Sequence, residues 1–160
     1  MEINGLQRDY IVHNLKEIKG FFGEYRFLSN FHQCPVYFEG SMYPSTENAF
    51  MAAKTLDLDE RLQFRKIEPK EAKAIGRQIK LRADWEEVKY DVMASVIFDK
   101  FYRNKGIRQK LIDTGSAYLE ETNHWNDRIW GVCEGEGQNH LGKILMRIRS
   151  FWQNQANEKN

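Results

Sequence analysis

Two side chains of opposite charge stand out in residues 43–54, YPSTENAFMAAK, because both can do chemistry. A glutamate such as Glu47 can move protons, and a desolvated lysine such as Lys54 can add to an electrophilic carbon. At about 100° per residue, their spacing puts them roughly 20° apart on one helix face. Charged side chains normally avoid an apolar face. The apolar members of this face are Phe50, Met51 and Leu58.

A direct ion pair does not explain the placement of Glu47 and Lys54. Residues seven apart lie about 10 Å apart along a helix axis, whereas helical ion pairs form three or four residues apart. Either each charge pairs with a separate group elsewhere in the fold, or both point into one polar cavity that holds a ligand. The helix by itself leaves both alternatives open.

A second stretch, ETNHWNDRIWGVCEGEGQNHLG at residues 121–142, is too rich in tryptophan, asparagine and glycine for regular structure. Loops on a rigid scaffold carry function more often than core segments do. Asp127 is a candidate acid or base, and Trp130 is a candidate stacking surface for a base or sugar. The alternative makes Asp127 a turn former and Trp130 a core residue.

Gly135 and Gly137 precede Asn139, which lies at the expected start of a helix. Backbone N–H groups left free at such a place could hold a phosphate. The spacing matches neither G-x-x-x-x-G-K-[ST] nor G-x-G-x-x-G, so neither nucleotide motif is present. The alternative is a tight turn, with Gly142 allowing close helix packing.

Metal chemistry and nucleophilic triads find little support in the sequence. There is no H-E-x-x-H motif and no paired C-x-x-C, and no Ser–His or Cys–His signature can be assembled. We therefore expect no metal and no cofactor. The dispersed histidines are His13, His32, His124 and His140.

The helices and strands that must position these residues can be predicted from hydrophobic periodicity and from capping and turn residues. Aromatic and β-favouring stretches at 21–31 and 34–40 predict short strands and turns. Ser45 is a good N-cap, Pro69 suits a first helical turn, and Asp84 with Glu87 resembles a capping box. Predicted helices cover 46–55, 69–78, 84–104, 107–113 (ended by Gly115) and 139–155, with 117–122 a candidate strand. Several helices packed around a small, mostly antiparallel sheet make the fold α+β, in a single domain of residues 1–160.

Composition bounds the class of protein. The 160 residues are 41% hydrophobic and 29% charged, as in a folded soluble protein. The balance of 24 Lys+Arg against 23 Asp+Glu gives no global attraction to nucleic acid, and the basic segment 66–82 is read as a solvated helical face. No apolar run approaches membrane-spanning length, and residues 1–14 lack a secretory pattern. Cys34 and Cys133 fit a reducing compartment, so we expect a cytoplasmic location.

Seven stretches occur together in the order typical of one family. They are FFGEYRFLSNF, YPSTENAFMAAK, IGRQIKLRADW, VMASVIFDKF, DTGSAYLEET, NDRIWG and NHLGKILMRIR. On these motifs the chain resembles the NADAR-domain family (the YbiA-like N-glycosidases) from about Lys19 to Arg149. Residues 1–18 and 150–160 lie outside the resemblance as terminal extensions.

The resemblance implies a YbiA-like α+β domain that hydrolyses N-glycosidic bonds of ribose. Its motif positions imply catalytic roles for Glu47, Lys54 and Asp127. They imply substrate-binding roles for Asn30, Trp85, Trp130, Gly131 and Asn139. Lys89 is a departure, because a typical member has arginine there, and this bears on a salt bridge or an anion contact.

Two substrate classes follow from the resemblance. One is ADP-ribose attached to guanine bases, in which case the partner is ADP-ribosylated nucleic acid. The other is the small phosphorylated ribosylamino-pyrimidine intermediates of riboflavin synthesis. Both join ribose to an exocyclic amine near a phosphate. The alternative function is a non-catalytic module that binds ADP-ribose or a related nucleotide.

The resemblance also suggests a mechanism. Lys54 would attack C1 of the ribose and form a transient Schiff base, while Glu47 and Asp127 move protons. Trp85 and Trp130 would shape the subsite for the base or ribose, and the loop before Asn139 would hold the phosphate. Direct hydrolysis by a carboxylate-activated water is the competing mechanism.

Overall fold

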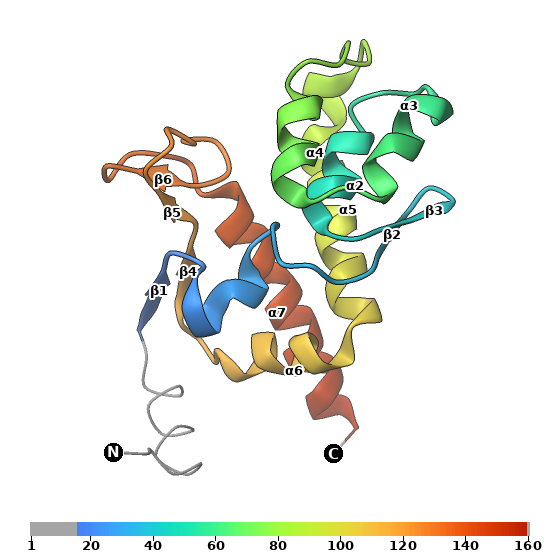
Figure 1. Cartoon of the computed structure of the whole chain (residues 1–160). Coiled ribbons are helices and arrows are strands. Elements are labelled where there is room, and N and C mark those ends of the chain that lie inside the picture. Colours follow the sequence, from blue (N-terminus) through green and yellow to red (C-terminus); the bar gives the residue numbers. More distant parts are fainter. Residues whose placement is uncertain (1–15, 160) are drawn as a thin grey trace. The chain divides into compact units, whose positions relative to one another are not determined.

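The computed structural model describes residues 16–159, so the expectations for residues 1–15, including His13, lie outside it. The fold is α+β, as the sequence predicts, and the chain forms two compact units (Figure 1). We call Asn30–Lys105 the central unit and residues 16–29 with 106–159 the terminal unit. The domain boundaries 1–160 stay a prediction. In the described part of the chain, no helix is both long enough and apolar enough to cross a membrane.

The central unit packs helices against one hairpin. Its elements are β2 (Val36–Phe38), β3 (Ser41–Tyr43), α2 (Thr46–Ala52), α3 (Leu58–Leu62), η2 (Gln63–Arg65), α4 (Pro69–Gly76) and α5 (Trp85–Arg103). Helix α2 lies against α4 and α5, and α5 also packs on β2. Every residue of α2 is buried, so it is a core helix and not an amphipathic one. Its start is the predicted one, because the Ser45 side chain accepts the N–H of Asn48.

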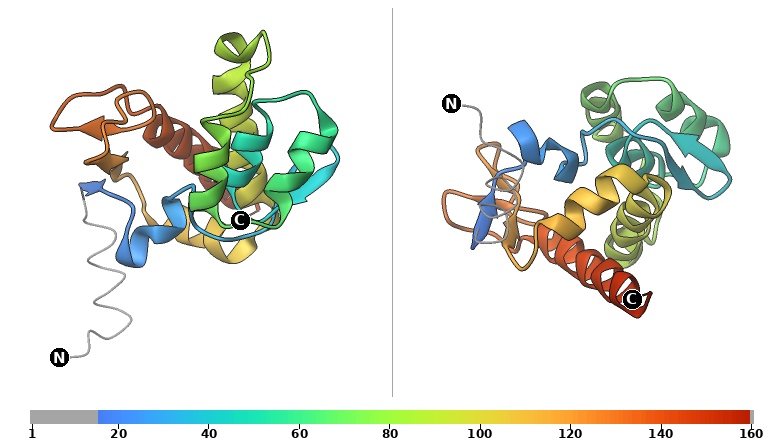
Figure 2. Two further views of the ribbon diagram at one scale, coloured as in Figure 1. Left: turned by 45° about the horizontal axis from the view of Figure 1, so that its top comes forward. Right: turned by 90° about the horizontal axis from the view of Figure 1, so that it is seen from below.

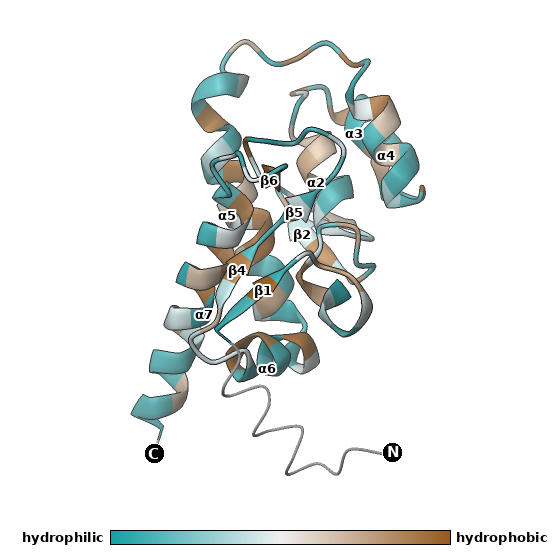
Figure 3. Ribbon diagram, turned by 90° about the vertical axis from the view of Figure 1, so that its left-hand side faces the viewer, coloured by the Kyte–Doolittle hydropathy of each residue, from teal (hydrophilic) through white to brown (hydrophobic). Residues whose placement is uncertain are grey.

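The terminal unit is built from both ends of the chain. Its elements are β1 (Glu17–Lys19), η1 (Gly23–Leu28), α6 (Lys105–Asp113, whose first residue belongs to the central unit), β4 (Tyr118–Glu120), β5 (Thr122–Asn123), β6 (Val132–Cys133) and α7 (His140–Glu158). Strand β1 lies beside β4 although the two are far apart in the sequence (Figure 2). Helix α7 packs on β4, and its last turns, toward the C-terminus, are mostly hydrophilic (Figure 3).

Strand pairing differs from the expected single, mostly antiparallel sheet. The strands form three two-stranded sheets, of which β2–β3 is antiparallel while β1–β4 and β5–β6 are parallel. Glu39 and Gly40, both with positive φ, form a tight hairpin turn between β2 and β3. Strands joined by such a turn pair antiparallel. The other pairs are closed by longer connections, which allow parallel strands.

Several element boundaries also differ from prediction. Helix α4 ends at Gly76 instead of residue 78, α7 runs on to Glu158 instead of residue 155, and part of the stretch 21–31, predicted as strands and turns, forms the 3-10 helix η1. Helix α2 stops at Ala52 instead of running to Thr55, and α6 begins at Lys105, two residues earlier than predicted. At α5 the predicted capping box is wrong, because the Asp84 side chain caps no backbone N–H. Its carboxylate is bound instead by the guanidinium of Arg82.

Candidate functional site

Lys54 lies just beyond α2, in the turn that follows the helix. Its backbone N–H donates to the Met51 carbonyl at 3.2 Å, and its Nζ donates to the carbonyl of Gly76 at 3.3 Å. The predicted helical stripe is therefore wrong at its far end, since Lys54 is not part of α2 and Leu58 is exposed in α3. The reason is that the chain leaves the helix at Ala53, which a helical wheel cannot foresee.

The close approach of α2 and α4 puts the Gly76 carbonyl within reach of Lys54. A Cβ atom on Gly76 would lie 2.2 Å from the Met51 sulfur and 2.9 Å from its Cγ, so a larger residue there would displace the Met51 side chain. Gly76 is the last residue of α4, where helix carbonyls lack an intrahelical partner and accept other donors. Sequence reasoning missed Gly76, although a glycine at the end of a predicted helix was visible.

Burial lowers the pKa of the Lys54 ammonium below its ordinary value. The negative charge of Glu47 acts in the opposite direction and raises this pKa, while the positive charges of Arg77 and Lys73 lower it further. The net result is a lowered pKa, which gives Lys54 a larger share of neutral amine near pH 7 than an exposed lysine has. A neutral amine is the nucleophilic form.

Glu47 is 6% exposed in the first turn of α2, and its backbone N–H donates to the Asn30 carbonyl at 3.1 Å. The Asn30 side chain also makes its contacts at the start of α2. Its Oδ1 accepts the Thr46 hydroxyl at 3.0 Å, and its Nδ2 lies 3.5 Å from the sulfur of Met93. The contacts of Asn30 therefore hold the start of α2, and with it Glu47; its substrate-binding role stays a prediction.

Trp85, the first residue of α5, is 5% exposed, and its ring centroid lies 5.1 Å from that of Phe50 on α2. Four of the predicted residues thus gather around α2 within the central unit: Asn30, Glu47, Lys54 and Trp85. Lys89, one turn beyond Trp85, pairs with the Glu86 carboxylate at 2.5 Å on the same helix.

Asp127 organises the loop that follows β5. Its Oδ1 accepts the backbone N–H groups of Ile129 at 3.2 Å and Trp130 at 2.9 Å. The Asn123 side chain bonds both backbone polar groups of Asp127, at 3.0 and 2.8 Å. These are the contacts of a turn former. An acid or base role for Asp127 stays a prediction, and Asn123 is a loop-building residue that sequence reasoning missed.

Carbonyl groups of this loop accept the backbone N–H groups at the start of α7. The carbonyl oxygens of residues 128–131 accept the backbone N–H groups of residues 138–141, at 2.8–3.2 Å. The predicted phosphate site before Asn139 is therefore wrong for these N–H groups, because other parts of the same loop occupy them. Glycines at 135 and 137 gave a correct signal for tight turns but no information about this partner.

The Asn139 side chain ties α7 to β4. Its Oδ1 accepts the backbone N–H of Glu121 at 3.1 Å, and its Nδ2 donates to the Leu119 carbonyl at 2.9 Å. The Trp130 ring is half-buried and meets the His140 ring edge-on, with centroids 6.2 Å apart. Asp127, Trp130, Gly131 and Asn139 thus form the second set of predicted residues, within the terminal unit. Their substrate-binding roles stay predictions.

Gly131 is required by close backbone packing. A Cβ atom there would lie 2.1 Å from the Glu121 carbonyl oxygen and 2.7 Å from the Asn123 amide nitrogen. We expect Gly131→Ala to lower the free energy of unfolding by about 2 kcal/mol or more, because the backbone must shift. Urea denaturation measures this loss. The control is Gly106→Ala in α6, where a Cβ meets nothing within 4 Å and stability should not fall. An equal loss in both variants would contradict the packing argument.

Among the described residues 16–159, no three His, Cys, Asp or Glu side chains gather as a metal-binding group. The candidate chemistry that the structure does show lies in two ionisable side chains. Around α2 it consists of a buried carboxylate and a half-buried amine of lowered pKa. A carboxyl group and an amine so placed can transfer protons and add to an electrophilic carbon.

Comparison with known proteins bears on this chemistry. The model of the NADAR domain family matches residues 19–152. A riboflavin biosynthesis protein of Vibrio vulnificus is 34% identical over 136 residues, which cover 81% of this chain but 36% of that protein. The N-glycosidase YbiA of Escherichia coli is 36% identical over 130 residues, covering 79% of this chain and 81% of YbiA. The NMR structure of Escherichia coli YbiA has a TM-score of 0.79 at 31% identity, covering 92% of this chain and 94% of that one.

Proposed function

This chain belongs to the NADAR domain family, and from that membership we propose that it is an N-glycosidase, a hydrolase that cleaves the C–N bond between ribose and an exocyclic amine. The family matches and the names of the relatives support a hydrolase acting on N-glycosyl bonds. The structural observation that carries the proposal is the Lys54 amine, half-buried beside the Glu47 helix with a lowered pKa.

The proposed mechanism begins with ring opening of the ribosyl amine. The bond between C1 and the ring oxygen breaks, the oxygen takes a proton from solvent, and C1 becomes an iminium carbon joined to the exocyclic nitrogen. The neutral amine of Lys54 then adds to C1. Glu47 carries a proton from the lysine nitrogen to the exocyclic nitrogen, which departs with its bonding electrons. C1 is left doubly bonded to Lys54 Nζ.

Water completes the cycle by adding to C1. As the water oxygen bonds to C1, Glu47 takes a proton from the water and passes it to Nζ. The C1–Nζ bond then breaks with its electrons going to Nζ, the remaining hydroxyl proton goes to solvent, and the open-chain ribose aldehyde forms. Every group on the enzyme returns to its starting state. A lysine is suited to this exchange because its amine acts as both nucleophile and leaving group once its pKa has been lowered.

The proposed substrate is a phosphorylated ribosyl amine, either a ribosylamino-pyrimidine phosphate or ADP-ribose on a guanine base. The test incubates the protein with each compound and measures release of ribose 5-phosphate or ADP-ribose by mass spectrometry. We expect wild type to release the sugar from one of them. The Glu47→Gln and Lys54→Met variants should not release it at a rate comparable to that of wild type. If wild type cleaves neither compound but still binds ADP-ribose, the protein is a binding module and not an enzyme.

A further inference from the structure

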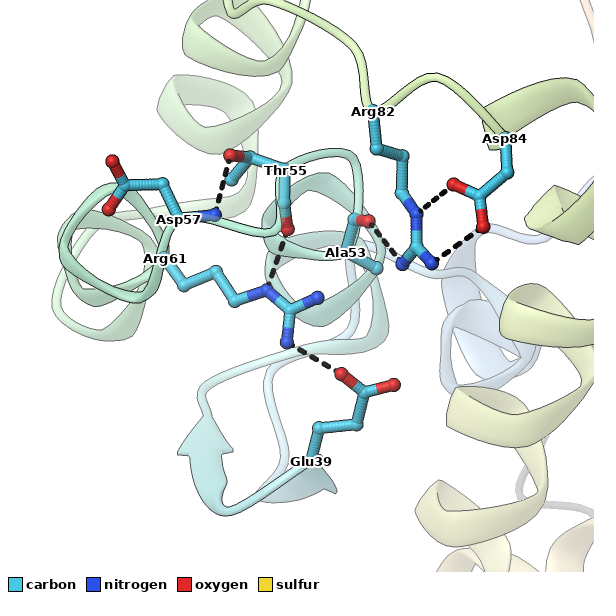
Figure 4. Close-up of polar contacts among 7 residues, drawn as sticks. All are labelled: Glu39, Ala53, Thr55, Asp57, Arg61, Arg82 and Asp84. Atoms are coloured by element: carbon cyan, nitrogen blue, oxygen red, sulfur yellow. Dashed lines mark hydrogen bonds and ion pairs between the residues drawn. The ribbon is translucent and has the colours of Figure 1, made fainter.

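The chain on either side of Lys54 is held through the backbone carbonyl groups of Ala53 and Thr55 (Figure 4). The backbone N–H of Arg82 donates to the Lys54 carbonyl at 2.8 Å, and Arg82 Nη1 reaches the Ala53 carbonyl at 3.5 Å. From the other side, Arg61 Nε donates to the Thr55 carbonyl at 2.8 Å. Two arginines thus hold three consecutive carbonyl groups after α2 ends. The carbonyls of Ala53 and Thr55 are held by side chains, and the carbonyl of Lys54 by the backbone N–H of Arg82, so a substitution of Arg82 removes the Ala53 contact and the pair with Asp84.

Arg82 is itself fixed by Asp84. Its Nε lies 2.6 Å from Asp84 Oδ1 and its Nη2 lies 2.9 Å from Asp84 Oδ2, which is a two-point pair of fixed geometry. The Arg82 side chain is only 13% exposed. Asp84 precedes α5 but does not cap it, since both of its oxygens are bound to Arg82.

Arg82 also reaches a second predicted site residue. Its carbonyl accepts the backbone N–H of Trp85 at 3.2 Å. Through Arg82, the backbone at Lys54 is joined directly to the start of α5, where the Trp85 ring packs on Phe50 of α2. Arg82 lies in the motif IGRQIKLRADW, but the sequence does not indicate this contact, and the basic segment 66–82 predicts a solvated helical face.

We propose that Arg82, held by Asp84, is a positioning residue for the reaction: it fixes the backbone from which the Lys54 amine reaches the Gly76 carbonyl. This inference rests on the proposed function. Misplacing a reacting group by about 1 Å can cost about 10²-fold in rate, so loosening the segment should act on turnover. Arg82 touches no substrate in this scheme and acts through Lys54.

The test compares Arg82→Gln with Arg103→Gln. Arg103 makes a matching two-point pair with Asp99, at 3.1 and 2.9 Å, on α5 in the same unit, and this pair does not touch residues 53–55. For Arg82→Gln we expect kcat to fall about 10- to 100-fold with KM changed less than about threefold. Arg103→Gln should keep both constants. Unchanged kcat in Arg82→Gln would overturn the proposal.

Two further variants separate positioning from a general loss of fold. Asp84→Asn should lower kcat in the same direction, and the double variant should lose no more than Arg82→Gln alone, because the pair acts as one unit. Millimolar guanidinium should restore part of kcat in Arg82→Ala. Additive losses without rescue, and with equal drops in the unfolding midpoint for the Arg82 and Arg103 variants, would make Arg82 a structural residue only.

A readout without turnover keeps the two proposals distinguishable. Reductive methylation with ¹³C-formaldehyde labels lysines, and the Lys54 signal is identified by its absence in Lys54→Met. We expect this signal to move toward those of exposed lysines in Arg82→Gln and to stay in place in Arg103→Gln. If wild type cleaves neither substrate, the proposed function fails while this shift still supports positioning; an unmoved signal overturns the positioning itself.

Discussion

Lys54→Met is expected to end turnover while leaving the protein as stable as wild type or more so. A positioned catalytic side chain contributes about 10²–10⁴-fold, and loss of the nucleophile should fall at the upper end of that range. Stability should not suffer, because methionine fills a similar volume and removes a charge that burial disfavours. The measurements are kcat on the cleaved substrate and the midpoint of urea unfolding.

Trapping identifies the covalent step in the same experiment. Borohydride added during turnover should fix the sugar on Lys54 of wild type, seen as a mass increase on the peptide that contains this residue, and should fix none on Lys54→Met. Lys80→Met, at an exposed position of the central unit, should behave as wild type. If Lys54→Met keeps full activity and borohydride fixes no sugar on wild type, direct hydrolysis by an activated water is favoured.

The lowered pKa of Lys54 also predicts the direction in which the reaction rate and the stability change with pH. The rate should rise with pH as Lys54 loses its proton, at a pH below that of an ordinary lysine. Between the lowered pKa in the fold and the ordinary value in the unfolded chain, the unfolded chain binds more protons, so stability also rises with pH. Lys54→Met should lack both contributions, and a pH profile of rate and of urea midpoint measures them.

Glu47→Gln is expected to lower kcat about 10²–10⁴-fold, because an amide of the same shape cannot exchange the proton. ADP-ribose should still bind with an unchanged Kd, which separates an enzyme from a binding module. The negative charge of Glu47 raises the pKa of Lys54, so its removal should move any remaining rate increase to lower pH. Calorimetry and the pH–rate profile give the two readings.

The matched control for this prediction is Glu71→Gln, an exposed acid-to-amide change on α4 in the same unit. It should leave kcat and Kd unchanged. Turnover by Glu47→Gln at the wild-type rate would remove Glu47 from the mechanism. Loss of ADP-ribose binding in Glu47→Gln alone would instead make Glu47 a ligand-binding residue.

Local signals in the sequence were reliable where one residue decides its own surroundings. Ser45 caps α2, Pro69 begins α4, and Gly115 follows α6 with positive φ, as predicted. The capping of α5 failed because Asp84 had a stronger partner in Arg82, whose fork binds both carboxylate oxygens. At the start of α7 the prediction of free N–H groups failed for a similar reason, since carbonyls of residues 128–131 accept the N–H groups of residues 138–141; a phosphate-binding role for the rest of the loop stays a prediction.

By itself, the sequence determined the α+β class, most helix positions and, through seven ordered motifs, the family. Only the tertiary structure decided what the candidate residues touch. The Lys54 amine meets a carbonyl 22 residues away, and that contact exists because α2 and α4 pack closely at Gly76. Propensity and periodicity report on neighbours along the chain, whereas burial, pKa and hydrogen-bond partners depend on groups that only packing brings together.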